Sequence, residues 1–188
     1  MGAARISAKI VALVATGGCA IAVGGFMLAA PSVADGPLPP PHRYTECSVS
    51  EGACFTSDPE EGTFRHARGA ADAAKARWRV PGWHRVAYLA DDGDHLVTGY
   101  DGMNLVPIEN PGQVEILTFW RRGEPVRCYR LSELVSTAAL VRTASHQHWG
   151  DYEGFDPDGN FRLSTVEGVV LVFSPATGEI VRRQREER

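Results

Sequence analysis

Apolar side chains recur at every second position, or in short apolar runs, along most of the chain between residues 83 and 181. Four segments, 86–100, 114–131, 155–165 and 169–181, each contain two such stretches separated by a tight turn. Every turn contains a Gly, which adopts positive φ at little cost, and two also contain Asp, which hydrogen-bonds its own backbone. Strand–turn–strand units at this spacing predict an antiparallel sheet built from hairpins.

One segment of the chain departs from this alternation. Ser132 can cap a helix. The apolar residues that follow have helical spacing: Leu134, Val135, Ala138, Ala139 and Val141. The segment 66–77 is Ala-rich, but Gly69 interrupts it and its end alternates, so helix and strand stay equally open there. The predicted fold class is mainly β, an antiparallel meander or sandwich with one short helix near residues 132–141.

The first 34 residues follow a different pattern. Arg5 and Lys9 precede an uncharged apolar run, 10–30, and the small residues at 32–34 suit a signal peptidase. This layout predicts a secretory signal peptide, residues 1–34, and a mature chain that begins near Asp35. An uncleaved membrane anchor is the alternative, because the run is just long enough to cross a bilayer. Four glycines within the run lower its hydrophobicity and favour cleavage.

A segment of low hydrophobic content lies between the signal peptide and the hairpins. Residues 35–46 contain four prolines, which is typical of an extended spacer. Residues 47–65 carry turn formers and acidic side chains, which is typical of a loop. We therefore divide the chain into a signal peptide (1–34), a Pro-rich and Cys-containing N-terminal segment (35–65) and a β-rich domain (66–188).

Cleavage changes the charge balance of the chain. Loss of Arg5 and Lys9 leaves 17 basic and 23 acidic residues, a formal charge of −6. Because phosphate binding needs a basic surface, this balance argues against DNA or RNA as a partner. About 150 residues remain, which is enough for one domain with one core. We expect a secreted or periplasmic protein with no stable membrane insertion after cleavage.

Three cysteines remain in the mature chain: Cys47, Cys54 and Cys128. In an oxidising compartment two of them are expected to form a disulfide. The bond Cys47–Cys54 is favoured because it closes a short loop in a segment with little hydrophobic content. Pairing of either residue with Cys128 is the alternative, since connectivity does not follow from sequence. Cys128 lies in an alternating segment, which predicts a small buried side chain.

Ser145–Gly150 is chemically the most unusual segment. On a strand, His146 and His148 point to the same face, a spacing that Zn²⁺ sites often use. Asp151 or Glu153 can add an oxygen ligand, and Glu153 can act on a metal-bound water, which gives a metal-dependent hydrolase as one hypothesis. Metal sites need three or four convergent ligands and only two are local. Packed or hydrogen-bonded imidazoles are therefore the simpler interpretation.

The loop Tyr100–Leu105 also leaves the alternation, and it carries polar and aromatic side chains. Loops of this kind on a rigid sheet often bind ligands. The corner Trp83-His84 has a similar character. We expect one ligand-binding surface to combine these three segments, through Trp83, Tyr100, Asp101, Asn104, His146, His148 and Trp149.

Three short segments carry a resemblance: 78–83, 99–105 and 145–150. In this order they resemble exported β-rich bacterial proteins of no assigned function, over roughly residues 75–183. The resemblance implies a shared fold and export, and it supplies no catalytic residues. We therefore expect a non-catalytic binding or interaction module of the cell envelope, with an envelope protein or a small ligand as partner. The metal-dependent hydrolase and an immunity-type inhibitor of a toxin are the alternatives.

Overall fold

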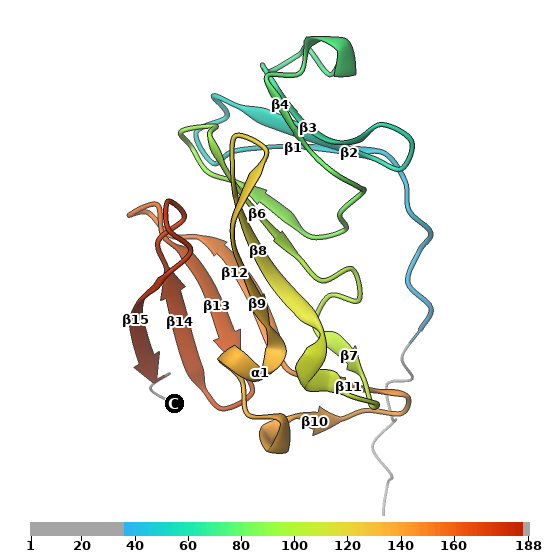
Figure 1. Cartoon of the computed structure of the whole chain (residues 1–188), viewed down its shortest axis with the longest axis vertical. Helices are drawn as coiled ribbons and strands as arrows, with labels where there is room; N and C mark the ends of the chain where they lie inside the picture. The colour runs from blue at the N-terminus through green and yellow to red at the C-terminus, as the bar shows by residue number, and fades with distance from the viewer. Residues whose placement is uncertain (1–35, 186–188) are drawn as a thin grey trace, which may run out of the picture. The chain divides into compact units, whose positions relative to one another are not determined.

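The computed structural model describes residues 36–185, so the predicted signal peptide lies outside the described residues. The described chain is mainly β, and its strands form four antiparallel sheets (Figure 1). This confirms the predicted fold class. A search of residues 36–185 for a helix long and apolar enough to cross a bilayer finds none.

Each sheet takes its strands from a limited part of the chain. The N-terminal sheet has the order β1 (Tyr44–Cys47), β2 (Cys54–Asp58), β3 (Gly62–His66), β4 (Trp78–Val80). The central sheet has the order β5 (Ala87–Leu89), β6 (His95–Gly99), β8 (Glu115–Arg121), β9 (Glu124–Arg130). The C-terminal sheet has the order β12 (Gly150–Phe155), β13 (Phe161–Thr165), β14 (Val169–Phe173), β15 (Ile180–Arg185). A small sheet has the order β10 (Val141–Arg142), β11 (His146–His148), β7 (Leu105–Pro107).

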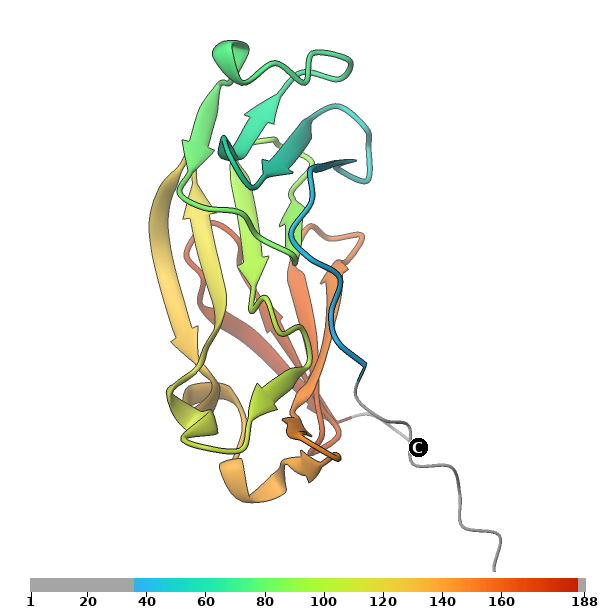
Figure 2. The ribbon, with the colours of Figure 1, turned by 90° about the vertical axis from the view of Figure 1, so that its right-hand side faces the viewer.

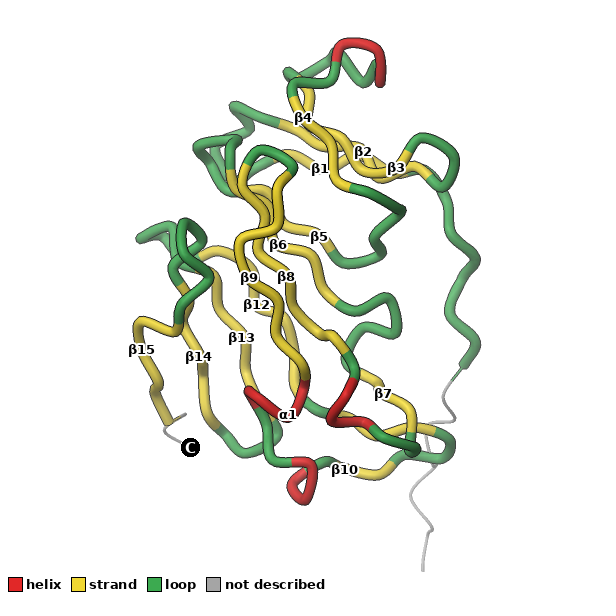
Figure 3. The backbone as a smooth tube through the Cα atoms, in the orientation of Figure 1, coloured by secondary structure: helices red, strands yellow, loops and turns green. Residues whose placement is uncertain are grey.

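Within residues 36–185, helical structure is confined to single turns (Figure 3). They are α1 (Leu131–Leu134) and the 3₁₀ turns η1 (Ala73–Lys75), η2 (Pro111–Gln113) and η3 (Thr137–Ala139). The helix predicted near 132–141 is therefore too long, because Val135 is extended at φ −133° and ψ 138° and ends α1. Ser132 is not the cap either, because it lies inside α1 and Arg130 is the N-cap residue. The Glu133 carboxylate accepts the N–H of Arg130 at 2.7 Å. The segment 66–77 contains the end of β3 and the turn η1.

The segment 47–65, predicted as a loop, contains β2 and most of β3. The loop prediction is wrong because these strands bury hydroxyl groups rather than a clear apolar stripe. The hydroxyls of Ser57 and Thr63 are 3.0 Å apart, and that of Thr56 lies 2.9 Å from Nε2 of His66. β3 pairs with β4, so this sheet also spans the domain boundary placed at residue 66.

The predicted disulfide is present in this sheet. Cys47 on β1 and Cys54 on β2 are directly opposite each other and are bonded. The pairing favoured from the sequence is therefore confirmed, and Cys128 carries a free thiol. A disulfide between neighbouring strands fits a protein that folds in an oxidising compartment.

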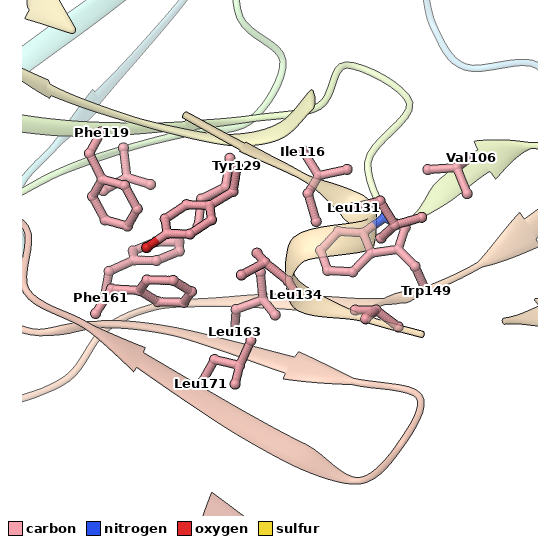
Figure 4. Close-up of a cluster of buried hydrophobic side chains, with 14 residues drawn as sticks. Val106, Ile116, Phe119, Tyr129, Leu131, Leu134, Trp149, Phe161, Leu163 and Leu171 are labelled. Carbon is pink, nitrogen blue, oxygen red and sulfur yellow. The ribbon is translucent and has the colours of Figure 1, made fainter. Parts of the chain in front are cut away.

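The larger hydrophobic core lies between the central and C-terminal sheets. Figure 4 shows Phe119 and Tyr129 from the central sheet facing Phe161, Leu163 and Leu171. The ring centroids of Phe119 and Phe173 are 5.4 Å apart, and those of Phe119 and Phe161 are 6.2 Å apart. Burial of these rings is the main favourable contribution to packing of the two sheets.

A smaller core lies between the N-terminal sheet and the opposite face of the central sheet. Phe55 and Val80 of the N-terminal sheet pack there with Leu89 and Leu96 of the central sheet. Neighbouring residues of β6 serve both cores, because Val97 belongs to the larger core and Leu96 to the smaller one. The N-terminal sheet lies at one end of the central strands (Figure 2). The remainder of that face is not covered by this sheet.

One charged side chain is buried beside the smaller core. Arg65 is opposite Phe55 and Trp78 in the strand register, so the three side chains share a face of the N-terminal sheet. Nε and Nη1 of Arg65 are buried, and no group within residues 36–185 accepts a hydrogen bond from them. A buried donor without a partner is destabilising.

Replacement of Arg65 by methionine is therefore expected to raise the free energy of unfolding by about 1 kcal/mol, because it keeps a long side chain and removes the charge. Urea denaturation measures the change. Arg65→Lys, which keeps a buried charge, is the matched control and is expected to give no gain. A loss of stability in Arg65→Met would show that the guanidinium makes a favourable interaction.

Candidate functional site

An open groove of about 450 Å³ lies on the outer face of the central sheet. Its aromatic side chains are Trp83, Tyr100 and Trp120, and its carboxylates are Asp101 and Glu115. His84, the hydroxyls of Thr98 and Thr118, and the thiol of Cys128 also line it. We call this site the aromatic groove. It combines a large apolar surface with a few polar groups, as ligand sites commonly do.

The strand register explains why these side chains point outward. Thr98 on β6, Thr118 on β8 and Cys128 on β9 are cross-strand partners, so they share one face. Trp120 lies on the same face, and its indole N–H donates to the Thr98 hydroxyl at 2.8 Å. The prediction that Cys128 is buried is wrong, because alternation along β9 directs Tyr129 into the core instead.

The corner at Trp83 is attached directly to the loop Tyr100–Asn104. The Arg85 N–H donates to the Asp101 carboxylate at 3.0 Å, and the Arg85 Nε–H donates to the Asp101 carbonyl at 3.0 Å. The same guanidinium lies 4.9 Å from the centroid of the Trp83 ring. Two of the three predicted segments therefore form one wall of the aromatic groove.

The other end of this loop is attached to the third segment. The Trp149 indole N–H donates to the Met103 carbonyl at 3.1 Å, and the Trp149 backbone N–H donates to the Asn104 carbonyl at 3.2 Å. At the start of the loop, the Tyr100 N–H donates to the Tyr152 hydroxyl at 2.9 Å. These bonds fix the loop to the core and thereby position Tyr100 and Asp101.

The structure places the predicted site residues in four different environments, of which the core, which holds Trp149, is the fourth. Trp83, Tyr100 and Asp101 line the aromatic groove. His146 lines a separate hollow of about 400 Å³, which Tyr100 also borders. Asn104 and His148 both lie against Asp151: the Asn104 amide donates to its carboxylate at 2.8 Å, and Nε2 of His148 is 3.6 Å from it.

Trp149 has a different role from the one expected. Its side chain is 0% exposed and belongs to the larger core, so it cannot contact a ligand at the surface. Figure 4 shows Trp149 beside Leu131 and Val106 at one end of that core. We therefore correct its assignment from ligand contact to anchor of the loop.

The two histidines proposed as metal ligands lie on β11. The Ser145 hydroxyl lies 2.8 Å from Nδ1 of His146, and both histidines are half-buried. Within residues 36–185, no group of three or more His, Cys, Asp or Glu side chains is arranged to hold a metal ion. The pair thus has the predicted strand spacing, and Asp151, one of the two expected oxygen ligands, lies beside His148.

Two titratable groups of the groove have displaced pKa values, the His84 imidazole and the Cys128 thiol. Burial lowers the pKa of the His84 imidazole below the ordinary value, while the nearby Asp101 carboxylate and the Pro81 carbonyl act in the opposite direction. Nε2 of His84 lies 3.1 Å from that carbonyl, and its ring is 6.3 Å from the Trp120 ring. A lowered pKa keeps the imidazole neutral at pH 7.

We expect an NMR titration of the His84 ring protons to give a pKa below about 6.5, the ordinary value. Asp101→Asn is expected to lower this pKa further, because it removes a negative charge that favours the protonated ring. In the unfolded chain His84 has its ordinary pKa and is protonated at a higher pH than in the folded protein. Protonation therefore lowers the free energy of unfolding as the pH falls below about 6.5. A His84 pKa that is unchanged in Asp101→Asn, or raised by it, would contradict the placement of this carboxylate beside the ring.

The sequence did not identify Thr98, Thr118 or Trp120 as site residues. Trp120 follows strand alternation, a pattern that favours the core. In the structure it is half-buried, contacts the smaller core and lines the groove. Alternation separates the two faces of a strand but does not say which face a neighbouring sheet leaves open. Which part of the central sheet stays open depends on how far the N-terminal sheet extends over it, and the sequence does not show this.

No protein-family model matches this chain, and comparison with curated proteins finds no sequence similar to it. Function is therefore inferred from the geometry and chemistry of the aromatic groove.

Proposed function

We propose that this protein is an exported, non-catalytic binding module of the cell envelope, and that the aromatic groove holds its ligand. The observation that carries the proposal is the groove itself, whose volume of about 450 Å³ is typical of ligand sites. Its walls are fixed by hydrogen bonds from Trp149 and Arg85 rather than formed by a free loop. A preformed site of this kind binds a ligand at a low ordering cost.

Two features support export. The N-terminal 34 residues have the charge, apolar run and small residues of a signal peptide. The Cys47–Cys54 disulfide is of a kind that forms and persists in oxidising compartments. We infer a secreted or periplasmic location for the mature chain.

The chemistry of the groove supports binding rather than catalysis. Cys128 is the most nucleophilic side-chain type in its lining, and partial desolvation of its thiol, together with the charge of Glu115, raises its pKa although the residue is exposed. A raised pKa disfavours the thiolate, which is the reactive form. The Thr118 hydroxyl lies 3.5 Å from the sulfur, and no histidine within the described residues is bonded to it.

The test is affinity chromatography of an envelope extract on the processed protein. We expect a component to be retained by the wild-type protein and to be released chemically unchanged. A variant that fills the groove, Thr118→Trp, is expected to lose this component, whereas Glu109→Gln, at an exposed position outside the groove, keeps it. Equal retention by all three proteins, or recovery of a chemically altered component, would contradict the proposal.

A further inference from the structure

We propose that the aromatic groove selects a small organic cation, an ammonium group carried on carbon. This inference rests on the proposed function, because it names the ligand class of the same groove. It follows from the charges of the lining, from the aromatic faces and from the size of the site.

The charges of the lining are of one sign. Asp101 and Glu115 are carboxylates, and none of the lining residues is Lys or Arg. Within residues 36–185, neither carboxylate forms a salt bridge; Asp101 accepts a hydrogen bond from a backbone N–H of Arg85. His84 is neutral at pH 7 because burial lowers its pKa, so it does not offset these charges. One positive charge lies at the rim, where the Arg85 guanidinium contacts Trp83 and donates to the Asp101 carbonyl. A cation inside the groove is therefore attracted to two carboxylates and repelled by one guanidinium, which leaves a net attraction.

The aromatic faces suit a cation that carries carbon. The Trp83 ring already has a guanidinium 4.9 Å from its centroid, which is a cation–π contact at the rim of the groove. The Trp120 ring is held by its hydrogen bond to Thr98, and the main chain of Tyr100 is held by the bond from its N–H to the Tyr152 hydroxyl. Indole and phenol rings bind alkylammonium groups through the negative charge of their faces.

The size and the charge of the groove distinguish a small organic cation from a neutral sugar as its ligand. A volume of about 450 Å³ fits a small molecule. A neutral sugar can also stack on Trp and Tyr rings, but it leaves Asp101 and Glu115 without a counter-charge. Because neither carboxylate forms a salt bridge within residues 36–185, the pair favours a cationic ligand over a neutral one.

The test compares choline with its neutral isostere 3,3-dimethylbutan-1-ol, which has the same shape and no charge. We expect isothermal titration at low ionic strength to show about three- to tenfold tighter binding of choline. Asp101→Asn keeps an oxygen for the Arg85 N–H and is expected to weaken choline binding about threefold, with no effect on the isostere. Glu115→Gln is expected to act in the same direction, and Glu109→Gln, outside the groove, is expected to have no effect.

The outcomes separate the two proposals. Equal affinity for choline and its isostere, or binding of methyl glucoside without binding of choline, overturns the cation proposal. If choline does not bind while Thr118→Trp still abolishes retention of an envelope component, the cation proposal falls and the binding module stands. If neither choline nor any extract component depends on the groove, both proposals fall.

Discussion

Replacement of Trp149 by alanine is expected to lower the free energy of unfolding by about 4 kcal/mol, because it leaves a large cavity in the main core. The side chain is 0% exposed, and its ring lies 5.1 Å from that of Tyr152. The same change removes the hydrogen bond to the Met103 carbonyl, so the loop Tyr100–Asn104 is expected to lose its fixed position. Chemical denaturation measures the first effect, and amide hydrogen exchange in the loop measures the second.

Trp149→Phe is the matched control for this experiment. It retains most of the buried ring and removes the indole N–H, so it is expected to cost about 1–2 kcal/mol and to increase exchange in the loop. A Trp149→Ala protein with unchanged stability would show that this residue is not in the core. Unchanged exchange in both variants would show that the bond to Met103 does not hold the loop.

Removal of the disulfide is expected to have the second largest effect. Cys47 and Cys54 are separated by seven positions, and a closed loop of this length restricts the unfolded chain by about 2–3 kcal/mol. The double variant Cys47→Ser and Cys54→Ser is therefore expected to lose this amount in urea denaturation. Burial of Cys54, which is 1% exposed, adds a smaller cost for the serine hydroxyl.

Cys128→Ser provides the comparison, because Cys128 is exposed and forms no disulfide. We expect it to change the free energy of unfolding by less than about 0.5 kcal/mol. If the double variant were as stable as the wild-type protein, the bond would have no stabilising role. A large loss in Cys128→Ser would show that this thiol has a structural role.

The hairpins of the central and C-terminal sheets could be predicted from their strands. In these strands apolar and polar side chains alternate, or every side chain is apolar, and glycine-containing turns separate them. The turn at Gly123 illustrates this: its φ is +90°, and a Cβ there would lie 2.3 Å from the Arg79 carbonyl oxygen. The N-terminal strands could not be predicted in this way. Their buried positions include Thr56, Ser57 and Thr63, whose hydroxyls are satisfied by partners that only the sheet brings together.

The helix near 132–141 was overestimated for a related reason. Leu131 and Leu134 face the core as helical spacing requires, but Val135 is also buried and extended. Tertiary packing thus ends the helix after one turn, although propensity favours its continuation. Periodicity in such a short segment does not distinguish the two outcomes.

Part of the site could be found from the sequence. Trp83, Tyr100 and Asp101 interrupt the alternation, and they lie together in the aromatic groove. Trp149 also interrupts it, but its neighbours do not reveal that the indole enters the core. Trp120 could not be predicted as a groove residue, because the face it occupies depends on the register between β6 and β8. That register pairs Trp120 with Leu96.

The most direct measurement uses the four tryptophans of the chain. Their indole N–H groups all donate to protein acceptors, and each gives its own signal in a ¹⁵N–¹H spectrum. Trp83 and Trp120 line the groove, whereas Trp78 and Trp149 do not. Titration with choline is predicted to shift the signals of Trp83 and Trp120 in a saturable manner and to leave the other two unchanged. No saturable shift at Trp83 and Trp120, or equal shifts at all four, would contradict an organic-cation site in the groove.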